Sequence, residues 1–379
     1  MNDERPPGSS FILHRSAFGK VAVIHDWLTG MRGGEQVLEG ILQCLPDAEV
    51  FTLFHFPGSV SPLIESHAIQ TSSLQRLAPK VDDYRKLLPL FPRAARQWDL
   101  SRFNTIVSSS HCVAKGVNAR GRPHLCYCHT PMRYIWDRFD DYFPRSKPLQ
   151  RAAMSAVAPW LRRWDVRTVT EVTEFVANSH FVRDRIRRHY GREAEVIAPF
   201  VDEAFLDAPL ARDRSDEHVI VSALVPYKRI ELAIEAVAGT PRRLAIIGTG
   251  PLHERLRRQV PPNVSLLGYV SRAEIIERLS RARSLILPGV EDFGITPLEA
   301  MALGTPVVAL RAGGALDSVV HGATGIFFDE PMVKSLRQAL DEVEGLEWNR
   351  EAIRRRAAEF SRSRFQRQFV EALTRVTSK

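Results

Sequence analysis

The sequence predicts an α/β protein with two doubly wound parallel sheets. Short apolar runs alternate with stretches of helical period along most of the 379 residues. The composition, 44% hydrophobic and 25% charged, is typical of globular domains, and the length suffices for two or three of them. The alternation lapses at residues 208–216, which carry charges and a proline, and this stretch is the predicted linker.

In the first half, the pattern begins with a predicted strand at 21–24, a glycine-rich loop and a helix from Glu35. Further predicted strands are 49–54, 103–107, 124–128, 174–177 and 195–198. Parallel strands joined by helices form sheets covered on both faces. Ligands of such sheets lie beyond the carboxyl ends of the strands, so we expect the chemistry in the loops that follow strands.

The second half alternates more regularly. Its predicted strands are 218–223, 243–247, 264–267, 284–287 and 306–310, and its predicted helices are 228–237, 252–260, 272–282 and 333–343.

The chain carries a formal net charge of +8, which favours anionic partners: nucleic acid, phosphorylated metabolites or an acidic membrane face. Its four cysteines are too few for a disulfide scaffold, and Cys126 and Cys128 are interpreted as buried thiols within a strand, so no metal is predicted. The polar first ten residues and the absence of a long apolar run predict a cytoplasmic protein, free or peripheral on the inner face of the cell membrane.

One loop carries the strongest local signal. It follows the predicted strand 284–287 and leads into a helix, for which Thr296 is the expected N-cap, Pro297 the first residue and Glu299 the partner in a capping box. Glu299 would then only cap its helix. A second interpretation, compatible with the first, is that main-chain N–H groups at Gly294, Ile295 and Thr296 bind a phosphate or a sugar hydroxyl.

Glu291 lies eight residues before Glu299, and two carboxylates beside a donor-rich loop suit a polyol that carries an anion. Both stand in EDFGITPLEAMALGTPVVA, which resembles the nucleotide-sugar loop of retaining GT-B glycosyltransferases of family 4. Supporting segments occur in the family's order: HDWLTGMRGGEQVL (25–38), CHTPMRYIWD (128–137), VANSHFVRDRI (176–186), VSALVPYKRIELAIEA (221–236), IIGTGPL (246–252), LLGYVS (266–271) and RAGGALDSVVHGATGIFF (311–328). Several of these forms are similar to bacterial mannosyltransferase-like members that build surface polysaccharides.

The resemblance implies a GT-B fold, in which two Rossmann-like domains face each other across a cleft. We expect an acceptor domain over 1–207, a nucleotide-sugar-binding domain over 208–360, and a C-terminal helix over 361–379 that returns to the first domain. The implied reaction is retaining transfer of a hexose, with mannose from GDP-mannose favoured, to a lipid-linked or polysaccharide acceptor in cell-surface glycan biosynthesis. The alternatives are a nucleotide-sugar epimerase or hydrolase, and a non-catalytic scaffold of the same fold.

The resemblance also implies residue roles in the second half. Glu299 would bind the ribose hydroxyls, and Glu291 would contact the transferred sugar near the reacting centre. The main chain of Gly294 and Ile295 would donate to the sugar or diphosphate, with Phe293 and Thr296 in the same nucleotide-sugar-binding loop.

Lys228 would hold the diphosphate, although by itself it could be a solvated lysine at a helix start. The family has an arginine five residues before that lysine. This chain has Ala223 there, and Arg229 or another nearby arginine is the expected substitute.

In the first half, Gly33 and Gly34 would approach the diphosphate or acceptor, although a strand-to-helix turn also needs glycines. His129 resembles the family's active-site histidine and would hydrogen-bond the sugar or the acceptor. No metal-ligand cluster is evident, so we expect a metal-independent enzyme without a cofactor.

Residues 144–168 carry six basic side chains against one acid, interleaved with Trp160 and Trp164. This pattern suits an interfacial helix on anionic lipid and equally an amphipathic helix packed on its own domain. No nucleic-acid recognition motif is visible, so nucleic acid is not an expected partner.

Overall fold

The computed structural model describes residues 18–81 and 83–379. The prediction of a cytoplasmic protein rests in part on the first ten residues, which lie outside this range. The chain divides into two compact units. Among the described residues, unit 1 comprises 18–81, 83–178, 182–197 and 365–379, and unit 2 comprises 179–181 and 198–364.

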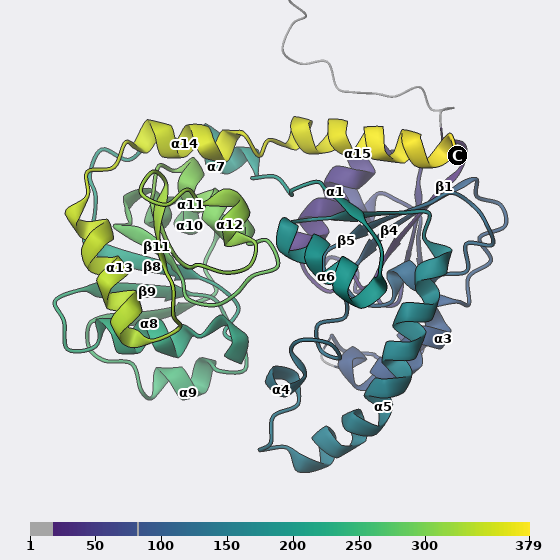
Figure 1. The fold of residues 1–379 in the computed structure, drawn as a ribbon, viewed down its shortest axis with the longest axis horizontal. Coiled ribbons are helices and arrows are strands. Elements are labelled where there is room, and N and C mark those ends of the chain that lie inside the picture. Colours follow the sequence, from purple (N-terminus) through teal and green to yellow (C-terminus); the bar gives the residue numbers. More distant parts are fainter. Residues whose placement is uncertain (1–17, 82) are drawn as a thin grey trace, which may run out of the picture. The chain divides into compact units, whose positions relative to one another are not determined.

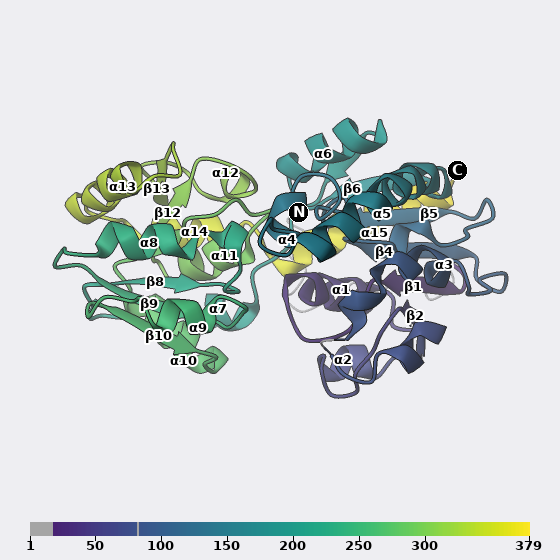
Figure 2. The same ribbon diagram turned by 90° about the horizontal axis from the view of Figure 1, so that it is seen from below.

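Unit 1 contains a seven-stranded parallel sheet in the order β3-β2-β1-β4-β5-β6-β7 (Figures 1 and 2). Its strands are β1 (Val21–His25), β2 (Glu49–Thr52), β3 (Ile69–Thr71), β4 (Thr105–Ser110), β5 (His124–Cys128), β6 (Glu174–Ala177) and β7 (Ala194–Val196). Its helices are α1 (Gly33–Cys44), α2 (Pro62–Glu65), α3 (Phe91–Ala95), α4 (Phe139–Tyr142), α5 (Pro148–Arg167), α6 (His180–Tyr190) and most of α15 (Arg362–Thr377), with 3₁₀ turns at 73–77, 84–90, 114–116 and 168–171.

Unit 2 contains a six-stranded parallel sheet in the order β10-β9-β8-β11-β12-β13. Its strands are β8 (Glu217–Val221), β9 (Arg243–Ile247), β10 (Val264–Gly268), β11 (Ser284–Leu287), β12 (Val307–Leu310) and β13 (Gly325–Phe328). Its helices are α7 (Glu203–Asp207), α8 (Ile230–Val237), α9 (His253–Arg257), α10 (Arg272–Arg281), α11 (Ile295–Ala302), α12 (Ala315–Ser318), α13 (Val333–Gly345) and α14 (Arg350–Ala358), with a 3₁₀ turn at 226–228.

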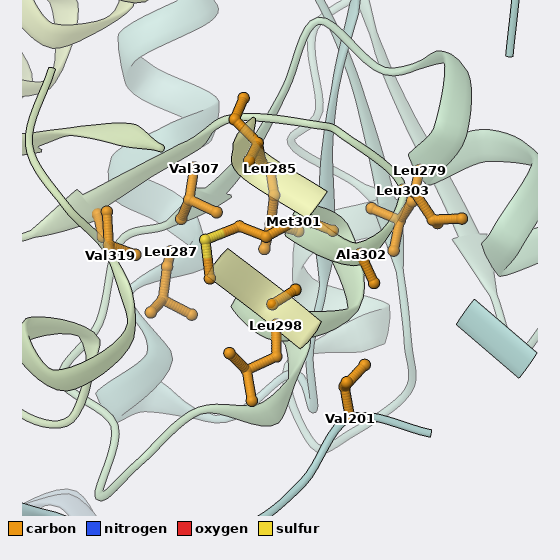
Figure 3. Packing of buried hydrophobic residues seen from close by; sticks show 14 of the residues in the cluster. Val201, Leu279, Leu285, Leu287, Leu298, Met301, Ala302, Leu303, Val307 and Val319 are labelled. Carbon is orange, nitrogen blue, oxygen red and sulfur yellow. The ribbon is translucent and has the colours of Figure 1, made fainter. Parts of the chain in front are cut away.

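The strands of unit 2 alternate their side chains between two hydrophobic cores. Leu285 and Leu287 of β11 pack in the core that also holds side chains of α7, α10, α11 and α14, whereas Ile286 packs in the core that holds α8, α9 and α13. Figure 3 shows Leu298 and Met301 of α11 pointing into the first of these cores, beside side chains of β11 and β12. Because both faces are covered, the strands are apolar runs rather than alternating ones.

In each sheet, the order of strands reverses at one point, between β1 and β4 in unit 1 and between β8 and β11 in unit 2. The loops that leave the carboxyl ends of strands diverge at such a point and form the ligand-binding crevice of doubly wound sheets. The predicted α/β class with two doubly wound sheets is confirmed. Two short strands, β3 and β13, were not predicted from the sequence.

Cys126 and Cys128 are buried in β5, as predicted, and neither forms a disulfide. Among the described helices, none combines the length and apolar character needed to cross a membrane.

Candidate active site

The loops after β8 and β11 meet at the reversal point of the unit 2 sheet. The side chains of Lys228 and Glu291, which come from these two loops, form an ion pair, and both are largely shielded from solvent. Gly289 allows the approach, since a Cβ at this position would lie 2.6 Å from the carbonyl oxygen of Tyr227 and 2.8 Å from Cα of Lys228. The structure thus brings together the residues expected to hold the diphosphate and the sugar.

The expected N-cap of the next helix is wrong by two residues. Helix α11 begins at Ile295, and its N-cap is Gly294, whose φ of 87° is in the region that favours glycine. Glu299 is therefore inside the helix, beyond the reach of a capping box. Within the described chain, the main-chain N–H groups of Gly294, Ile295 and Thr296 make no hydrogen bond. Helix N-termini with free N–H groups attract anions.

Glu299 has no structural hydrogen bond to explain its presence. Its carboxyl is half-buried and accepts no hydrogen bond from the described residues. Burial raises its pKa to about 7, with Arg272 opposing and Asp202 adding to the rise. Arg272 and Asp202 are themselves paired, with 2.7 Å between Nη1 and Oδ2. A carboxyl without a partner at the start of a ligand crevice is available for a ligand hydroxyl.

Gly313 and Gly314 support this loop, and no role was predicted for them from the sequence. A Cβ on Gly313 would lie 2.4 Å from the carbonyl oxygen of Glu291, and one on Gly314 would lie 2.2 Å from Cα of Phe293. The N–H of Gly314 donates to that same oxygen of Glu291 at 2.9 Å. The adjacent glycines after a strand were the signal that could have identified them.

The predicted substitute for the missing family arginine sits in an unusual conformation. Arg229 has φ 53° and ψ 41°, the left-handed region, where it joins the turn 226–228 to α8. The predicted start of this helix at Lys228 is therefore wrong, since α8 begins at Ile230. Ala223 is exposed, so a longer side chain could project from this position.

In unit 1, three histidines surround the reversal point. His25 ends β1, His111 follows β4 and His129 follows β5. Their ring centroids are 6.0–6.4 Å apart. Ser109 lies between two of them, with its Oγ 3.0 Å from Nδ1 of His25 and 2.8 Å from Nε2 of His129.

The burial of these rings keeps two of them neutral. Burial lowers the pKa of His111 to about 3, with the proximity of His25 adding to the effect. Burial, followed by His111 and His25, holds the pKa of His129 well below its usual range. At neutral pH, both rings therefore bind hydrogen-bonding groups rather than acting as cations.

Asp26 holds the loop that carries His111. Its buried carboxylate accepts hydrogen bonds from the main-chain N–H groups of four consecutive residues, 111–114, at 2.6–2.8 Å. One oxygen also lies 3.3 Å from Nδ1 of His111. Neither Asp26 nor Ser109 was identified from the sequence, because the residues they contact lie more than 80 positions away or in a neighbouring strand.

The predicted glycines lie at the same cluster. Gly33 and Gly34 are the first two residues of α1. A Cβ on Gly34 would lie 3.8 Å from Cε1 of His25 and 4.0 Å from Nε2 of His129. The structure therefore brings Gly34 and His129 together at a helix N-terminus.

Two family models match the chain in succession. The model described as Glycosyltransferase Family 4 matches residues 31–205, and the model described as Glycosyl transferases group 1 matches residues 202–360. The chain belongs to the family 4 glycosyltransferases.

Its relatives include the GDP-mannose-dependent alpha-(1-6)-phosphatidylinositol monomannoside mannosyltransferase of Mycolicibacterium smegmatis. The two are 33% identical over 204 residues, 46% of this chain and 53% of the relative. The protein of the same name from Mycobacterium tuberculosis is 31% identical over 46% of this chain and 52% of its own length. The chain spans about half the length of the curated relatives it matches.

Among solved structures, the family 4 chain is similar to Anabaena Alr3699/HepE in complex with UDP-glucose. The TM-score is 0.67 at 20% identity, covering 93% of this chain and 99% of the other. This likeness confirms the predicted GT-B fold. Within the described part of the chain, this glycosyltransferase family member has no group of three or more His, Cys, Asp or Glu side chains placed to hold a metal ion.

The basic stretch 144–168 folds largely into α5, and its two tryptophans differ. Trp160 is 47% exposed, whereas Trp164 packs against the hydrophobic core of unit 1. The single acid of the stretch, Asp165, is buried and lies 2.9 Å from Nζ of Lys115. Arg162 is also engaged, since its Nε donates to the carbonyl oxygen of Ile135 at 2.7 Å. One face of α5 thus packs on its own unit, and the other remains exposed.

Proposed function

We propose that this chain is a retaining glycosyltransferase that transfers a hexose from a nucleotide sugar, with mannose from GDP-mannose favoured, to a lipid-linked or polysaccharide acceptor. The observation that carries the proposal is the arrangement after β8 and β11. There, a lysine, a carboxylate paired with it and the free N–H groups of α11 gather at the reversal point of the sheet. This set matches what a sugar diphosphate offers: hydroxyl groups and two negative charges.

In this proposal, the charged groups act on the leaving nucleoside diphosphate. Negative charge grows on the departing phosphate oxygen as the glycosidic bond breaks. Lys228, assisted by Arg229, and the N–H groups of Gly294 and Ile295 stabilise that charge without a metal ion. Phe293 and Thr296 complete the loop, and its position is set by the close packing of Gly313 and Gly314.

The two carboxyl groups bind different parts of the donor. Glu299 binds the ribose hydroxyls, and Glu291 binds hydroxyls of the transferred sugar near the reacting carbon. Support for this division comes from the free carboxyl of Glu299 and from the position of Glu291 beside Lys228. A carboxylate accepts hydrogen bonds from two hydroxyl groups at once, which suits a vicinal diol.

Unit 1 supplies the acceptor side in this proposal. His129 hydrogen-bonds the sugar or the acceptor, and Gly33 and Gly34 present the N-terminus of α1 to a phosphate. The corresponding domain roles are an acceptor domain over 1–207, a donor domain over 208–360 and a C-terminal helix over 361–379 that belongs to the first.

The donor preference rests on relatives. The mycobacterial relatives are named as GDP-mannose-dependent, whereas the structurally similar Anabaena protein was solved with UDP-glucose. The higher sequence identity of the former favours GDP-mannose. The proposal of a lipid-linked acceptor rests on the same mycobacterial relatives, which are named as phosphatidylinositol monomannoside mannosyltransferases. The exposed face of α5 would bring the protein to an anionic membrane surface on the cytoplasmic side, where a lipid-linked acceptor resides.

A donor panel tests the proposal. Binding of GDP-mannose, UDP-glucose and ADP-glucose is measured by calorimetry, and nucleotide release is then followed with and without membrane-extracted lipid acceptors. We expect GDP-mannose to bind most tightly and its turnover to require an acceptor and to persist in EDTA. Release of GDP that no acceptor stimulates would indicate a hydrolase, isomerised donor would indicate an epimerase, and no binding of any donor would indicate a scaffold. Loss of activity in EDTA with rescue by Mg²⁺ or Mn²⁺ would contradict the metal-independent mechanism.

A further inference from the structure

We infer that Glu35 is a positioning residue that sets the tautomer of His129 through His25 and Ser109, so that Nδ1 of His129 is an acceptor. The inference rests on the proposed function only in assigning His129 to the substrate. The coupling itself is a property of the free protein.

The four side chains form an unbroken polar series. Oε1 of Glu35 lies 3.7 Å from Nε2 of His25, Nδ1 of His25 lies 3.0 Å from Oγ of Ser109, and that Oγ lies 2.8 Å from Nε2 of His129. His25 has no exposed surface, and Glu35 is 4% exposed. Nε2 of His25 is buried without a hydrogen-bond partner in the described chain, so the carboxylate of Glu35 is the charge it faces.

Glu35 is held in place and charged. Its other oxygen, Oε2, accepts the main-chain N–H of Arg32 at 3.0 Å, an N-terminal capping interaction of α1. Burial alone would raise the pKa of Glu35, but the interactions with His25 outweigh burial and lower it. An ionised carboxylate at 3.7 Å is too far for a hydrogen bond, yet it favours a proton on the facing nitrogen and repels a lone pair there.

The remaining proton positions follow from the donors and acceptors that each atom offers. With one proton on each ring, a proton on Nε2 of His25 leaves its Nδ1 as an acceptor, so Ser109 must donate to it. A hydroxyl has one proton, and Ser109 can then only accept from His129. His129 therefore carries its proton on Nε2, and its Nδ1 has a free lone pair.

Nδ1 of His129 is the nitrogen available to a ligand. It makes no hydrogen bond within the part of the chain that the structure describes, and the half-buried ring keeps some exposure. The main-chain N–H and C=O of His129 are bound to Ser110 and Asn178, which fixes the backbone. As an acceptor, Nδ1 takes a hydrogen bond from a sugar hydroxyl, whereas in the opposite tautomer Nδ1 would be a donor.

Other groups near the series are Arg133, which is a cation, and His111, on which a proton would disfavour a second proton on His129. His111 is engaged by Asp26, with 3.3 Å between Nδ1 and Oδ2. No hydrogen bond joins His111 to Ser109 or His129 in the described chain. Glu35 therefore determines the direction in which the hydrogen bonds from His129 to Ser109 and from Ser109 to His25 are donated.

Glu35→Gln should reverse the direction of hydrogen-bond donation between His25, Ser109 and His129. The N–H of Arg32 still needs an acceptor, so the amide oxygen takes that place and the NH₂ group faces Nε2 of His25. That nitrogen must now accept, the proton of His25 moves to Nδ1, Ser109 turns to donate to His129, and His129 becomes protonated on Nδ1. The capping bond and the side-chain volume are retained. Glu39→Gln, one turn further along the same helix and half-buried, is the matched control.

The test is a long-range ¹H–¹⁵N correlation spectrum of the full chain labelled on histidine, with His25 and His129 assigned by His→Gln variants. We expect Nε2–H for both rings in wild type and in Glu39→Gln, and Nδ1–H for both in Glu35→Gln. Ser109→Ala removes the hydroxyl group that joins His25 to His129, so adding Glu35→Gln to this variant should no longer change the tautomer of His129. Nδ1–H on His129 in wild type, a doubly protonated His25, or a His129 signal insensitive to Glu35→Gln would each overturn the inference.

Kinetics provide the second readout. We expect Glu35→Gln to lower kcat roughly fivefold to tenfold with little change in the donor KM, as for one lost hydrogen bond in the transition state. Equal kcat in Glu35→Gln and Glu39→Gln, together with a reversed tautomer, would show that the coupling exists and that the role assigned to His129 is wrong. If no donor supports turnover, the proposed function fails, and the spectra still decide the coupling.

Discussion

Lys228 and Glu291 form an ion pair across two loops that are 63 residues apart in the chain. In the proposed function, one side chain serves the diphosphate and the other serves the sugar. The carboxylate then competes with the diphosphate for the same ammonium group. Binding of a donor must exchange one ion pair for another, so part of the attraction for the diphosphate offsets the loss of the existing pair.

Glu291→Gln is therefore expected to bind the free nucleoside diphosphate more tightly than wild type, about threefold to tenfold, because Lys228 loses its competitor and a negative charge leaves the site. Turnover should fall at least tenfold, because the contact to the reacting sugar is lost. Calorimetry with the diphosphate and steady-state kinetics measure the two effects. Glu277→Gln on the exposed side of α10 is the control, and weaker diphosphate binding by Glu291→Gln would contradict the competition.

The pKa of Glu299 at about 7 predicts a pH dependence with a definite sign. The ionised carboxylate accepts ribose hydroxyls, so donor affinity should rise as pH increases from 6 to 8. Glu299→Gln should remove this rise and weaken donor binding about tenfold to a hundredfold at pH 8, as for hydrogen bonds to a charged group. A pH-independent donor affinity in wild type would contradict the role.

Stability should change with pH in the opposite direction. The pKa of Glu299 is raised above its usual value of 4.5, so the folded chain binds more protons than the unfolded chain between pH 4.5 and 7. The free energy of unfolding of unit 2 therefore decreases as pH rises through this range, by up to about 3 kcal/mol from this group. Urea titrations at pH 5 and pH 8 should show a smaller decrease in Glu299→Gln. Because Glu299 does not cap α11, the substitution should cost no capping energy.

Ala223→Arg should restore the cation of the family pattern. Position 223 is exposed and five residues before Lys228, so a guanidinium can be added without burying it. We expect the affinity for the nucleoside diphosphate to increase about threefold to tenfold at low salt and the gain to shrink at high salt. Ala223→Gln adds similar length without charge and should show no gain. An equal gain from both variants would indicate a packing effect.

Membrane attachment through α5 is expected to depend on its exposed arginines. Arg163 and Arg167 are exposed, whereas Arg162 is bonded to the main chain, so the former two are the residues to reverse. Arg163→Glu/Arg167→Glu should weaken binding to anionic vesicles at least tenfold at low salt, since each basic residue near such a surface contributes about 1 kcal/mol.

Co-sedimentation with anionic and neutral vesicles, at low and high salt, measures this effect. Arg258→Glu/Arg355→Glu changes the charge equally on two exposed positions of unit 2 and serves as the control. If both double variants lose binding to the same extent, the attraction is a matter of net charge and α5 has no special part in it.

The sequence predicted most of the fold because the strands are apolar runs between helices of regular period. The runs 124–128, 174–177, 243–247 and 284–287 are strands with these bounds. Two short strands were not predicted, since Ile69–Thr71 is mostly polar and exposed and Gly325–Phe328 begins with glycine, a residue depleted in strands. The start of α11 was misplaced because Gly294 caps it by its conformation, whereas Thr296 has the side chain that usually does so.

The site was predictable where one loop holds its residues, as around Glu291 and Glu299. It was not predictable where distant strands assemble it. Ser109 lies in a run of serines, Ser108–Ser110, which carries no signal of its own, and only the pairing of β4 with β1 and β5 places it between two histidines. Such contacts depend on strand order, which local patterns do not determine.

The division of unit 1 into separate stretches of chain bears on how the protein is made. Its last part, residues 365–379, lies beyond the whole of unit 2 in the sequence. Phe365 of this part contacts Tyr127 of β5 with ring centroids 5.7 Å apart, and Arg375 and Lys379 pair with Glu174 of β6. A ribosome delivers the chain from its N-terminus, so residues 365–379 are the last part of unit 1 to be made, after every residue of unit 2. Premature termination just before residue 365 would release a chain that has all of unit 2 but lacks the part of α15 that contacts β5 and β6 of unit 1.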